Sequence, residues 1–243
     1  MRAHWCMRAH RAAKLKIDFV LLTNDMKPKE INVLIACEES QAECEAFRAR
    51  GFNAYSCDVQ LCRYGGHIEW HIPGDVTPYL KGKTTFRTQD GKNHRLKKWH
   101  FILAHPPCTF LCKVSSVHMW VNGKIDDARH SKMNKARSFF LTCLAAKADF
   151  VAVENPLPMA MAELPPPDCF IQPYWFGVPY SKKTLFWLRN LPPIMADSCT
   201  STYREFVHSS RGKYRSRTFP EVAEALAHQW GDYIIEQYKC SGE

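Results

Sequence analysis

The stretch INVLIACEES, residues 31–40, determines how the rest of the chain is interpreted. Its first seven residues form an apolar run of strand length that is rich in β-branched side chains. Residues 40–50 then show helical spacing, and Gly51 stands where a left-handed residue commonly ends a helix. A second apolar run, residues 52–57, follows at once. The stretch therefore predicts a strand, a helix and a second strand in succession.

The same alternation continues along the chain. Residues 101–104, 150–153 and 185–188 are short apolar runs, and residues 126–146 have helical spacing. A capping box over residues 218–221 opens a final amphipathic helix. Strands that alternate with helices favour an α/β, Rossmann-like fold with a mostly parallel sheet and helices on both faces. Ligands of such sheets bind beyond the carboxyl ends of the strands, so the residues there are the candidates for function.

Composition and charge narrow the class of protein. The chain has 243 residues, with 33 Lys and Arg against 24 Asp and Glu, so its formal net charge is +9. A positive surface attracts polyanions such as nucleic acid, and solubility alone is the alternative explanation. No apolar run approaches the roughly 18 residues of a membrane-spanning helix, so no membrane partner is expected. Eleven cysteines occur without a Cys-x-x-Cys pair, which disfavours a structural metal site and indicates a reducing cytoplasm.

Residues 1–25 differ from the rest of the chain. The sequence MRAH occurs twice, at residues 1–4 and 7–10, and the first acidic residue is Asp18. A basic, acid-poor start is typical of organelle transit peptides. Because the strand pattern begins only at residue 31, we favour a dispensable N-terminal extension over residues 1–25, followed by a single domain over residues 26–243.

Two basic segments interrupt the alternation of strands and helices. Residues 81–98 contain seven Lys or Arg and a single acid, Asp90, which forms a hairpin-turn signal with Gly91. Residues 200–217 are also polar and basic. For the hairpin at residues 81–98, contact with phosphate groups and a merely solvated surface are alternatives of about equal weight.

Acidic and polar residues follow the early strands. Glu38 and Ser40 come after the first strand, Asp58 ends the second, and Asp75 follows an irregular stretch. Carboxylates in these places suit a nucleoside cofactor, because they accept hydrogen bonds from ribose hydroxyls or an adenine amino group. Taken alone, Asp58 is more simply a turn residue.

The sequence HPPC, residues 105–108, follows the apolar run at 101–104. Two prolines fix the backbone and hold the next side chain rigidly, which makes the Cys108 thiol a candidate nucleophile. A buried cysteine beside a structural turn is the alternative. The sequence ENP, residues 154–156, favours the catalytic interpretation, because the carboxyl group of Glu154 follows another strand and is able to face the same pocket.

In this order the motifs resemble those of DNA cytosine carbon-5 methyltransferases, above all the short, phage-type members with a His-Pro-Pro-Cys-Thr loop. The segment FGVPYSKKTLFWL, residues 176–188, is a further match, and the resemblance spans the chain from residue 31 to the final helix. Amino-directed DNA methyltransferases are similar in plan but have an aromatic residue in place of this cysteine. Cys108 therefore implies carbon-5 chemistry.

The resemblance implies an S-adenosylmethionine-dependent methyltransferase fold and a mechanism. Cys108 would attack carbon 6 of cytosine, and Glu154 would act on ring nitrogen 3 and the exocyclic amine. The cofactor would be S-adenosylmethionine, and the partner DNA, either a duplex with a flipped cytosine or a single strand, in the cytoplasm of a bacterial or phage-infected cell. The implied cofactor-binding residues are Ala36, Cys37, Glu38, Ser40, Asp58, Asp75 and Pro106, and the nucleic-acid-binding residues are Lys182, Lys183, Arg211 and Arg215.

The chain departs from the larger members of that family. ACEESQ, residues 36–41, replaces their glycine-rich cofactor loop, and YSKKT, residues 180–184, replaces their Gln-x-Arg-x-Arg element. Residues 189–243 are too few for a separate target-recognition domain together with the closing helix. Two alternatives therefore stay open. One is carbon-5 modification of a free pyrimidine nucleotide or use of a modified donor, and the other is a catalytically silent nucleic-acid-binding module.

Overall fold

The computed structural model describes residues 26–63, 65–205 and 217–240. Its helices are α1 (Ala42–Ala49), α2 (Thr77–Leu80), α3 (Asp127–Leu144) and α4 (Pro220–Cys240), with the 3-10 helices η1 (Pro28–Glu30), η2 (Lys113–Met119), η3 (Ala160–Ala162) and η4 (Pro173–Trp175). Its strands are β1 (Asn32–Ala36), β2 (Asn53–Asp58), β3 (His71–Pro73), β4 (Thr85–Arg87), β5 (Asn93–Arg95), β6 (Phe101–Ala104), β7 (Trp120–Val121), β8 (Lys124–Ile125), β9 (Phe150–Asn155), β10 (Cys169–Ile171), β11 (Tyr180–Ser181), β12 (Thr184–Arg189) and β13 (Arg204–Glu205).

Seven strands form the central sheet, in the order β10-β12-β9-β6-β1-β2-β3. Strands β1, β2, β3, β6 and β9 are parallel, whereas β12 runs antiparallel to both of its neighbours, β9 and β10. From β1 the chain moves outward to β2 and β3 and then returns to β6 on the other side of β1. The direction of the crossovers therefore changes between β1 and β6.

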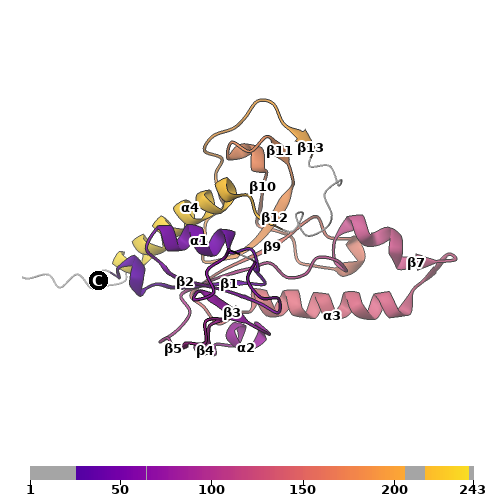
Figure 1. The fold of residues 1–243 in the computed structure, drawn as a ribbon. Helices are drawn as coiled ribbons and strands as arrows, with labels where there is room; N and C mark the ends of the chain where they lie inside the picture. The colour runs from indigo at the N-terminus through magenta and orange to yellow at the C-terminus, as the bar shows by residue number, and fades with distance from the viewer. Residues whose placement is uncertain (1–25, 64, 206–216, 241–243) are drawn as a thin grey trace, which may run out of the picture.

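Helices cover both faces of this sheet (Figure 1), with α1 and α4 on one face and α2 and α3 on the other. Successive side chains of β1 point to opposite faces, as a strand requires. Val33 and Ile35 pack in the cluster that contains Trp230 of α4, whereas Leu34 packs in the cluster that contains Phe140 of α3. Full burial of a side chain of this size contributes roughly 1.5–3 kcal/mol. An apolar run such as β1 is therefore stable only as a central strand.

The predicted α/β fold, with a mostly parallel sheet and helices on both faces, is confirmed. Every apolar run predicted as a strand contains one, and residues 126–146 contain α3. The basic hairpin predicted at residues 81–98 is present as β4 and β5, and Gly91 adopts φ 89°, a conformation that glycine favours. Strands β3 and β10 escape prediction because three residues show too little periodicity. Residues 1–25, predicted to be an extension, lie outside the described residues.

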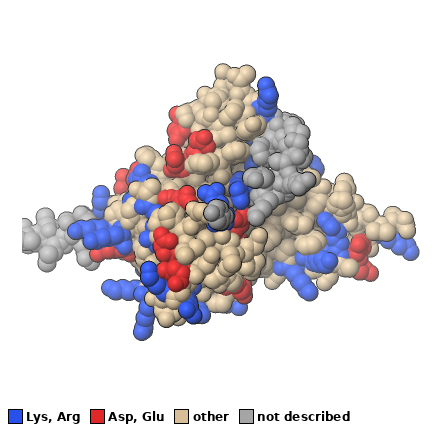
Figure 2. Space-filling model, viewed as in Figure 1, with Lys and Arg blue, Asp and Glu red and all other residues tan. Residues whose placement is uncertain are grey.

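Charged side chains are distributed over the surface. Figure 2 shows Lys and Arg spread across the drawn face and interspersed with Asp and Glu. No helix within the described residues is long and apolar enough to cross a membrane.

Candidate functional site

The carboxyl ends of β1 and β6 lie side by side at the point where the crossover direction changes. Ala36 of β1 and Ala104 of β6 are register partners, and the amide of His105 donates to the Ala36 carbonyl at 2.9 Å. Open α/β sheets bind their ligands in the crevice at such a point. The loops that begin at Cys37 and His105 are therefore the first place to look for a site.

A tight turn fixes the position of Cys108 in the loop after β6. Pro106 is buried at the start of this loop. The amides of Leu111 and Cys112 both donate to the Cys108 carbonyl, at 2.9 and 3.0 Å. Backbone hydrogen bonds of this kind hold the Cys108 and Cys112 side chains one turn apart.

The loop after β6 is also joined to the loop after β9. The amide of Lys113 donates to the Leu157 carbonyl at 2.7 Å, and the amide of Met159 donates to the Leu111 carbonyl at 2.7 Å. Glu154 is the last residue but one of β9 and lies just before this joined segment. The structure therefore brings the two predicted catalytic loops together.

The thiols of Cys108 and Cys112 share a hydrogen bond next to Glu154. That hydrogen bond, then burial and the charge of Glu154, raise the pKa of Cys108 well above its usual range. The same hydrogen bond lowers the pKa of Cys112 to about 5. At neutral pH the pair therefore holds one proton, on Cys108, and one negative charge, on Cys112.

His105 lies between two carboxylates that different elements contribute. Its Nδ1 is 3.4 Å from Oε2 of Glu154, and its Nε2 is 3.3 Å from Oε1 of Glu43 in α1. The three side chains are 15%, 20% and 2% exposed, respectively. Burial by itself would lower the pKa of His105, but the charges of Glu43 and Glu154 outweigh burial and raise it.

Glu38, predicted to bind the cofactor, is buried against Glu43. Its Oε1 accepts a hydrogen bond from the Glu43 amide at 2.8 Å, so it caps the start of α1. Burial and then the charge of Glu43 raise the pKa of Glu38 well above its usual range. Burial opposes ionisation of Glu43 as well, but His105 and hydrogen bonds lower its pKa. The two shifts are opposite in direction, so ionisation of the pair is favoured at Glu43, on the side of His105.

The remaining predicted cofactor residues near β1 to β3 lie in turns. Ala36 is buried, and Cys37 adopts φ 62° at the end of β1. Asp58 Oδ1 accepts from the amide of residue 60 at 2.8 Å, and Asp75 Oδ1 accepts from the amide and hydroxyl of Thr77 at 2.9 and 2.7 Å. Burial, then the charges of Asp58 and Asp75, raise the pKa of Cys57. The two carboxylates are therefore close enough to act on one thiol.

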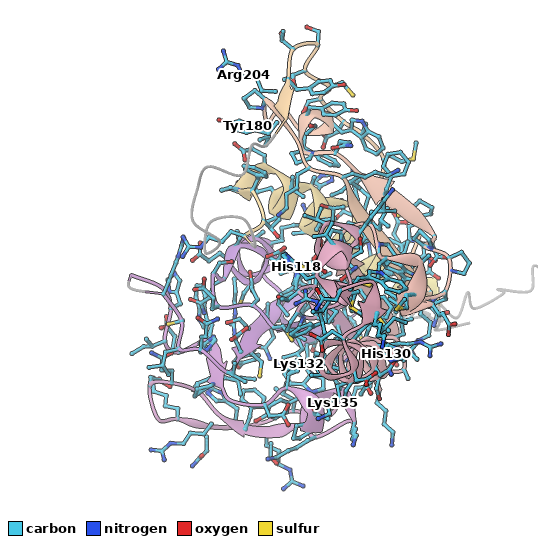
Figure 3. All side chains as sticks on the ribbon, turned by 90° about the vertical axis from the view of Figure 1, so that its right-hand side faces the viewer. His118, His130, Lys132, Lys135, Tyr180 and Arg204 are labelled. Carbon is cyan, nitrogen blue, oxygen red and sulfur yellow. The ribbon has the colours of Figure 1, made fainter. Side chains whose placement is uncertain are left out.

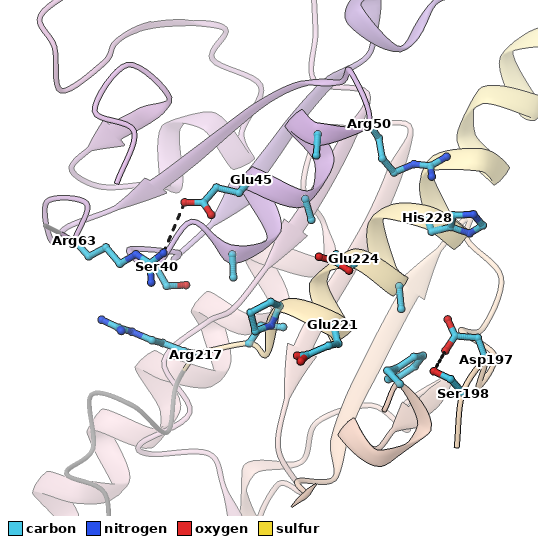
Figure 4. A pocket seen from close by; sticks show the side chains of 17 residues that line it. Ser40, Glu45, Arg50, Arg63, Asp197, Ser198, Arg217, Glu221, Glu224 and His228 are labelled. Atoms are coloured by element: carbon cyan, nitrogen blue, oxygen red, sulfur yellow. Dashed lines mark hydrogen bonds and ion pairs between the residues drawn. The ribbon is translucent and has the colours of Figure 1, made fainter. Parts of the chain in front are cut away.

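Ser40 lines a pocket of about 820 Å³ between α1 and the N-terminal half of α4 (Figure 4). This volume is typical of small-molecule sites. Asp58 and Asp75 do not line it. Alanines form part of its wall, and charged side chains of both signs surround it, namely Glu45, Arg50, Arg63, Asp197, Arg217, Glu221, Glu224 and His228. One ion pair crosses part of the rim, between Glu45 and Arg63 at 3.8 Å.

The predicted nucleic-acid residues divide into two groups. Lys182 lines a cavity of about 30 Å³ together with Glu43, His105 and Glu154, and its Nζ donates to a backbone carbonyl, that of residue 217, at 3.2 Å. Lys183 is exposed, with its Nζ 4.2 Å from the centre of a Phe ring at residue 170. Arg211 and Arg215 lie outside the described residues.

A further set of exposed basic side chains, not predicted from the sequence, lies in and near the segment between the Cys108 loop and α3. Lys113, His118, Lys132 and Lys135 are exposed. Figure 3 shows His118, Lys132 and Lys135 on the side of the molecule where η2 and α3 lie. Trp120, at the start of a short hairpin in this segment, is 52% exposed. An exposed aromatic side chain among cations is typical of nucleic-acid surfaces.

Sequence reasoning did not select Glu43 or His105 as site residues. Glu43 stands in the first turn of a helix, where acidic residues commonly interact with the helix N-terminus. His105 had a detectable signal, because it immediately precedes Pro-Pro-Cys at the end of a strand. Only the fold shows that His105 contacts Glu154 and that Glu43 contacts His105.

Comparison with models of known protein families and with curated proteins found no match. Among the described residues, no group of three or more His, Cys, Asp or Glu side chains is placed to hold a metal ion.

Proposed function

We propose that the chain transfers a methyl group from S-adenosylmethionine to carbon 5 of cytosine in DNA, through a covalent adduct with Cys108. The observation that carries this proposal is the position of Cys108 beside Glu154, on joined loops at the carboxyl edge of the sheet. A sulfur nucleophile and a carboxyl group in this arrangement are able to act on one pyrimidine ring at two positions.

The thiol pair and the carboxyl group have separate tasks in this reaction. Carbon 5 of cytosine is a poor nucleophile. When the Cys108 sulfur bonds to carbon 6, its proton passes to the Cys112 thiolate, and the ring becomes an enamine that is nucleophilic at carbon 5. Glu154 donates a proton to ring nitrogen 3 as negative charge develops there. Once carbon 5 is methylated, a base removes its proton and the Cys108 sulfur leaves.

S-adenosylmethionine would supply an electrophilic methyl group. Two features of the structure fit this cofactor. Asp58 and Asp75 each use Oδ1 for a local turn, and the second oxygen of each carboxylate suits a hydroxyl or amino group of a nucleoside. The pocket lined by Ser40 has charges of both signs, which suit an amino-acid moiety.

DNA is the proposed acceptor because exposed cations lie near the catalytic loops. Lys113 directly follows Cys112, and Lys132 and Lys135 are on α3. Positive side chains of this kind bind phosphate groups without regard to sequence. A cytosine inside a duplex is out of reach of Cys108, so the target base must be flipped out or single-stranded.

Trapping with 5-fluorocytosine tests the proposal. Fluorine cannot leave carbon 5 as a proton does, so wild-type protein with S-adenosylmethionine should form an adduct with 5-fluorocytosine DNA that survives a denaturing gel. Cys108→Ser should form none, because a hydroxyl is a far weaker nucleophile than a thiolate. Cys199→Ser, which changes an exposed thiol, is the matched control and should be trapped like the wild type.

The same assay separates the alternatives. Trapping of free 5-fluorocytidine nucleotide but not of DNA would make the acceptor a nucleotide. DNA binding without any trapping would indicate a catalytically silent module. Loss of trapping in Cys112→Ser, with full trapping in Cys108→Ser, would assign the nucleophile to Cys112.

A further inference from the structure

The structure holds a buried chain of ionisable groups, of which the reaction above uses only Glu154. Glu38, Glu43, His105 and Glu154 come from the loop after β1, from α1, from the loop after β6 and from β9. Lys182 faces the same cavity. Burying a charge is costly unless it is paired, so an arrangement of this size calls for an explanation.

The geometry around His105 favours a hydrogen on both ring nitrogens. Nδ1 faces Glu154 Oε2 and Nε2 faces Glu43 Oε1, and a carboxylate only accepts hydrogen bonds. A neutral imidazole has one N–H, whereas imidazolium has two. Glu43 Oε1 and His105 Nε2 are both buried and have no hydrogen-bond partner of ordinary geometry, so their mutual attraction is what compensates for their burial.

We propose that His105 is a positioning residue and proton partner for Glu154, kept as imidazolium by the buried carboxylate of Glu43. This inference rests on the proposed function. As charge develops on ring nitrogen 3, the proton on His105 Nδ1 passes to the Glu154 carboxylate, and Glu154 passes a proton to nitrogen 3. Both transfers reverse when nitrogen 3 is released. No proton is gained or lost over the cycle through this route.

Burial makes a local proton source necessary. The cavity shared by Glu43, His105, Glu154 and Lys182 has a volume of about 30 Å³, enough for little more than one water molecule. The groups facing His105 are Glu43 and Glu154, which favour its protonated form, and Lys182, which opposes it. Glu38 lies behind Glu43, and burial, then the charge of Glu43, raise its pKa and so favour its uncharged form. Removing the charge of Glu43 should therefore shift the balance at His105 towards the neutral form.

Glu43→Gln tests the inference by two measurements. Histidine-labelled protein, titrated by NMR, should show that His105 deprotonates about one pH unit lower in the variant, a tenfold change in its protonation equilibrium. The His105 signal is identified by its absence in His105→Asn. The alkaline limb of adduct formation with 5-fluorocytosine DNA should move to lower pH by the same amount, because His105 is protonated only below its pKa. Glu163→Gln, which changes an exposed carboxylate paired with Arg137 at 3.4 Å, should change neither measurement.

The outcomes are distinguishable from failure of the proposed function. A wild-type protein that traps no substrate overturns both the function and this role. A wild-type protein that traps DNA, with an unchanged His105 titration and pH profile in Glu43→Gln, overturns the role of His105 alone. If Glu43→Gln does not fold, Glu43→Asp is the second variant. Its shorter side chain keeps the negative charge but moves it away from His105, so the pH at which His105 deprotonates should fall by a smaller amount. An unchanged titration in that folded variant would equally overturn the role.

Discussion

Two groups of loops border the same edge of the sheet. The loops after β1, β2 and β3 form the first half of this edge, and β9 with the loops after β6 and β9 forms the second half. The polar side chains of the two halves differ in what they contact. In the first half, Glu38, Asp58 and Asp75 each accept hydrogen bonds from amides two to five residues away. In the second half, Glu154 lies against His105, 49 residues away in sequence. The first half stabilises its own turns, whereas the second half brings distant groups together.

This difference separates carboxylates whose position a local turn explains from side chains whose position only a functional role explains. An acidic residue that caps a turn has a sufficient structural reason to be where it is. A histidine buried between two carboxylates does not, because an apolar side chain would fill the space with less loss of solvation. The catalytic proposal therefore stands on the second half of the edge, and the cofactor proposal needs direct tests of the first half.

The largest effect is expected for Glu154→Gln, which removes the proton donor of the second half. Methyl transfer should fall about 10²–10⁴-fold, the range for loss of a general acid or base. The melting temperature and the affinity for S-adenosylmethionine should change little, because glutamine keeps the size of the side chain. Incorporation of labelled methyl groups into DNA and calorimetric titration of the cofactor measure these two quantities.

Glu163→Gln is the matched control for that experiment. Glu163 lies in the segment after β9, is largely exposed and pairs with Arg137 at 3.4 Å. The control should transfer methyl groups at the wild-type rate. A Glu154→Gln protein with the wild-type rate would remove the catalytic role from the second half of the edge.

An effect of intermediate size is expected on the rate at which the thiols of Cys108 and Cys112 are alkylated. Because the pKa of Cys112 is about 5, this residue is a thiolate throughout pH 6–8, and its alkylation by iodoacetamide should be nearly independent of pH there. An ordinary thiol becomes about 100-fold more reactive over the same range at first order in thiolate. Mass spectrometry of digested protein reports the rate at each cysteine.

Cys108→Ala sharpens this test, because it removes the hydrogen-bond donor that stabilises the Cys112 thiolate. Alkylation of Cys112 at pH 6 should then fall at least about tenfold, corresponding to a rise of about two units or more in its pKa. Cys108→Ser keeps a donor and should change the rate less. Alkylation of Cys112 that is equally fast in Cys108→Ala would show that the two thiols are not coupled.

The sequence predicted the fold well because its information is local. A run such as β1 is apolar at four of its five side chains and buried at all five, as residues on both faces of a central strand are. The strand order, the antiparallel β12 and the short β3 depend on contacts between distant segments and leave no periodic signal. Cys108 and Glu154 were chosen as candidates because each follows an apolar run at a motif. Glu43 was missed because its partner His105 becomes its neighbour only when α1 packs beside the sheet.

Asp58→Asn and Asp75→Asn test the first half of the edge. Their effect, on the affinity for S-adenosylmethionine, should be the smallest of the three. Asparagine keeps an Oδ1 acceptor, so the hydrogen bonds to residues 60 and 77 and the folded state should survive. Loss of the carboxylate should still weaken S-adenosylmethionine binding about tenfold at each position, since a hydrogen bond to a charged group contributes roughly 1.5–3 kcal/mol. Calorimetry with the cofactor measures this change directly.

Alanine at the same positions removes the turn acceptor too, so it should lower the melting temperature as well as the affinity. If both asparagine variants bind with the wild-type dissociation constant, the first half of the edge is structural throughout, and the pocket lined by Ser40 becomes the cofactor site to test.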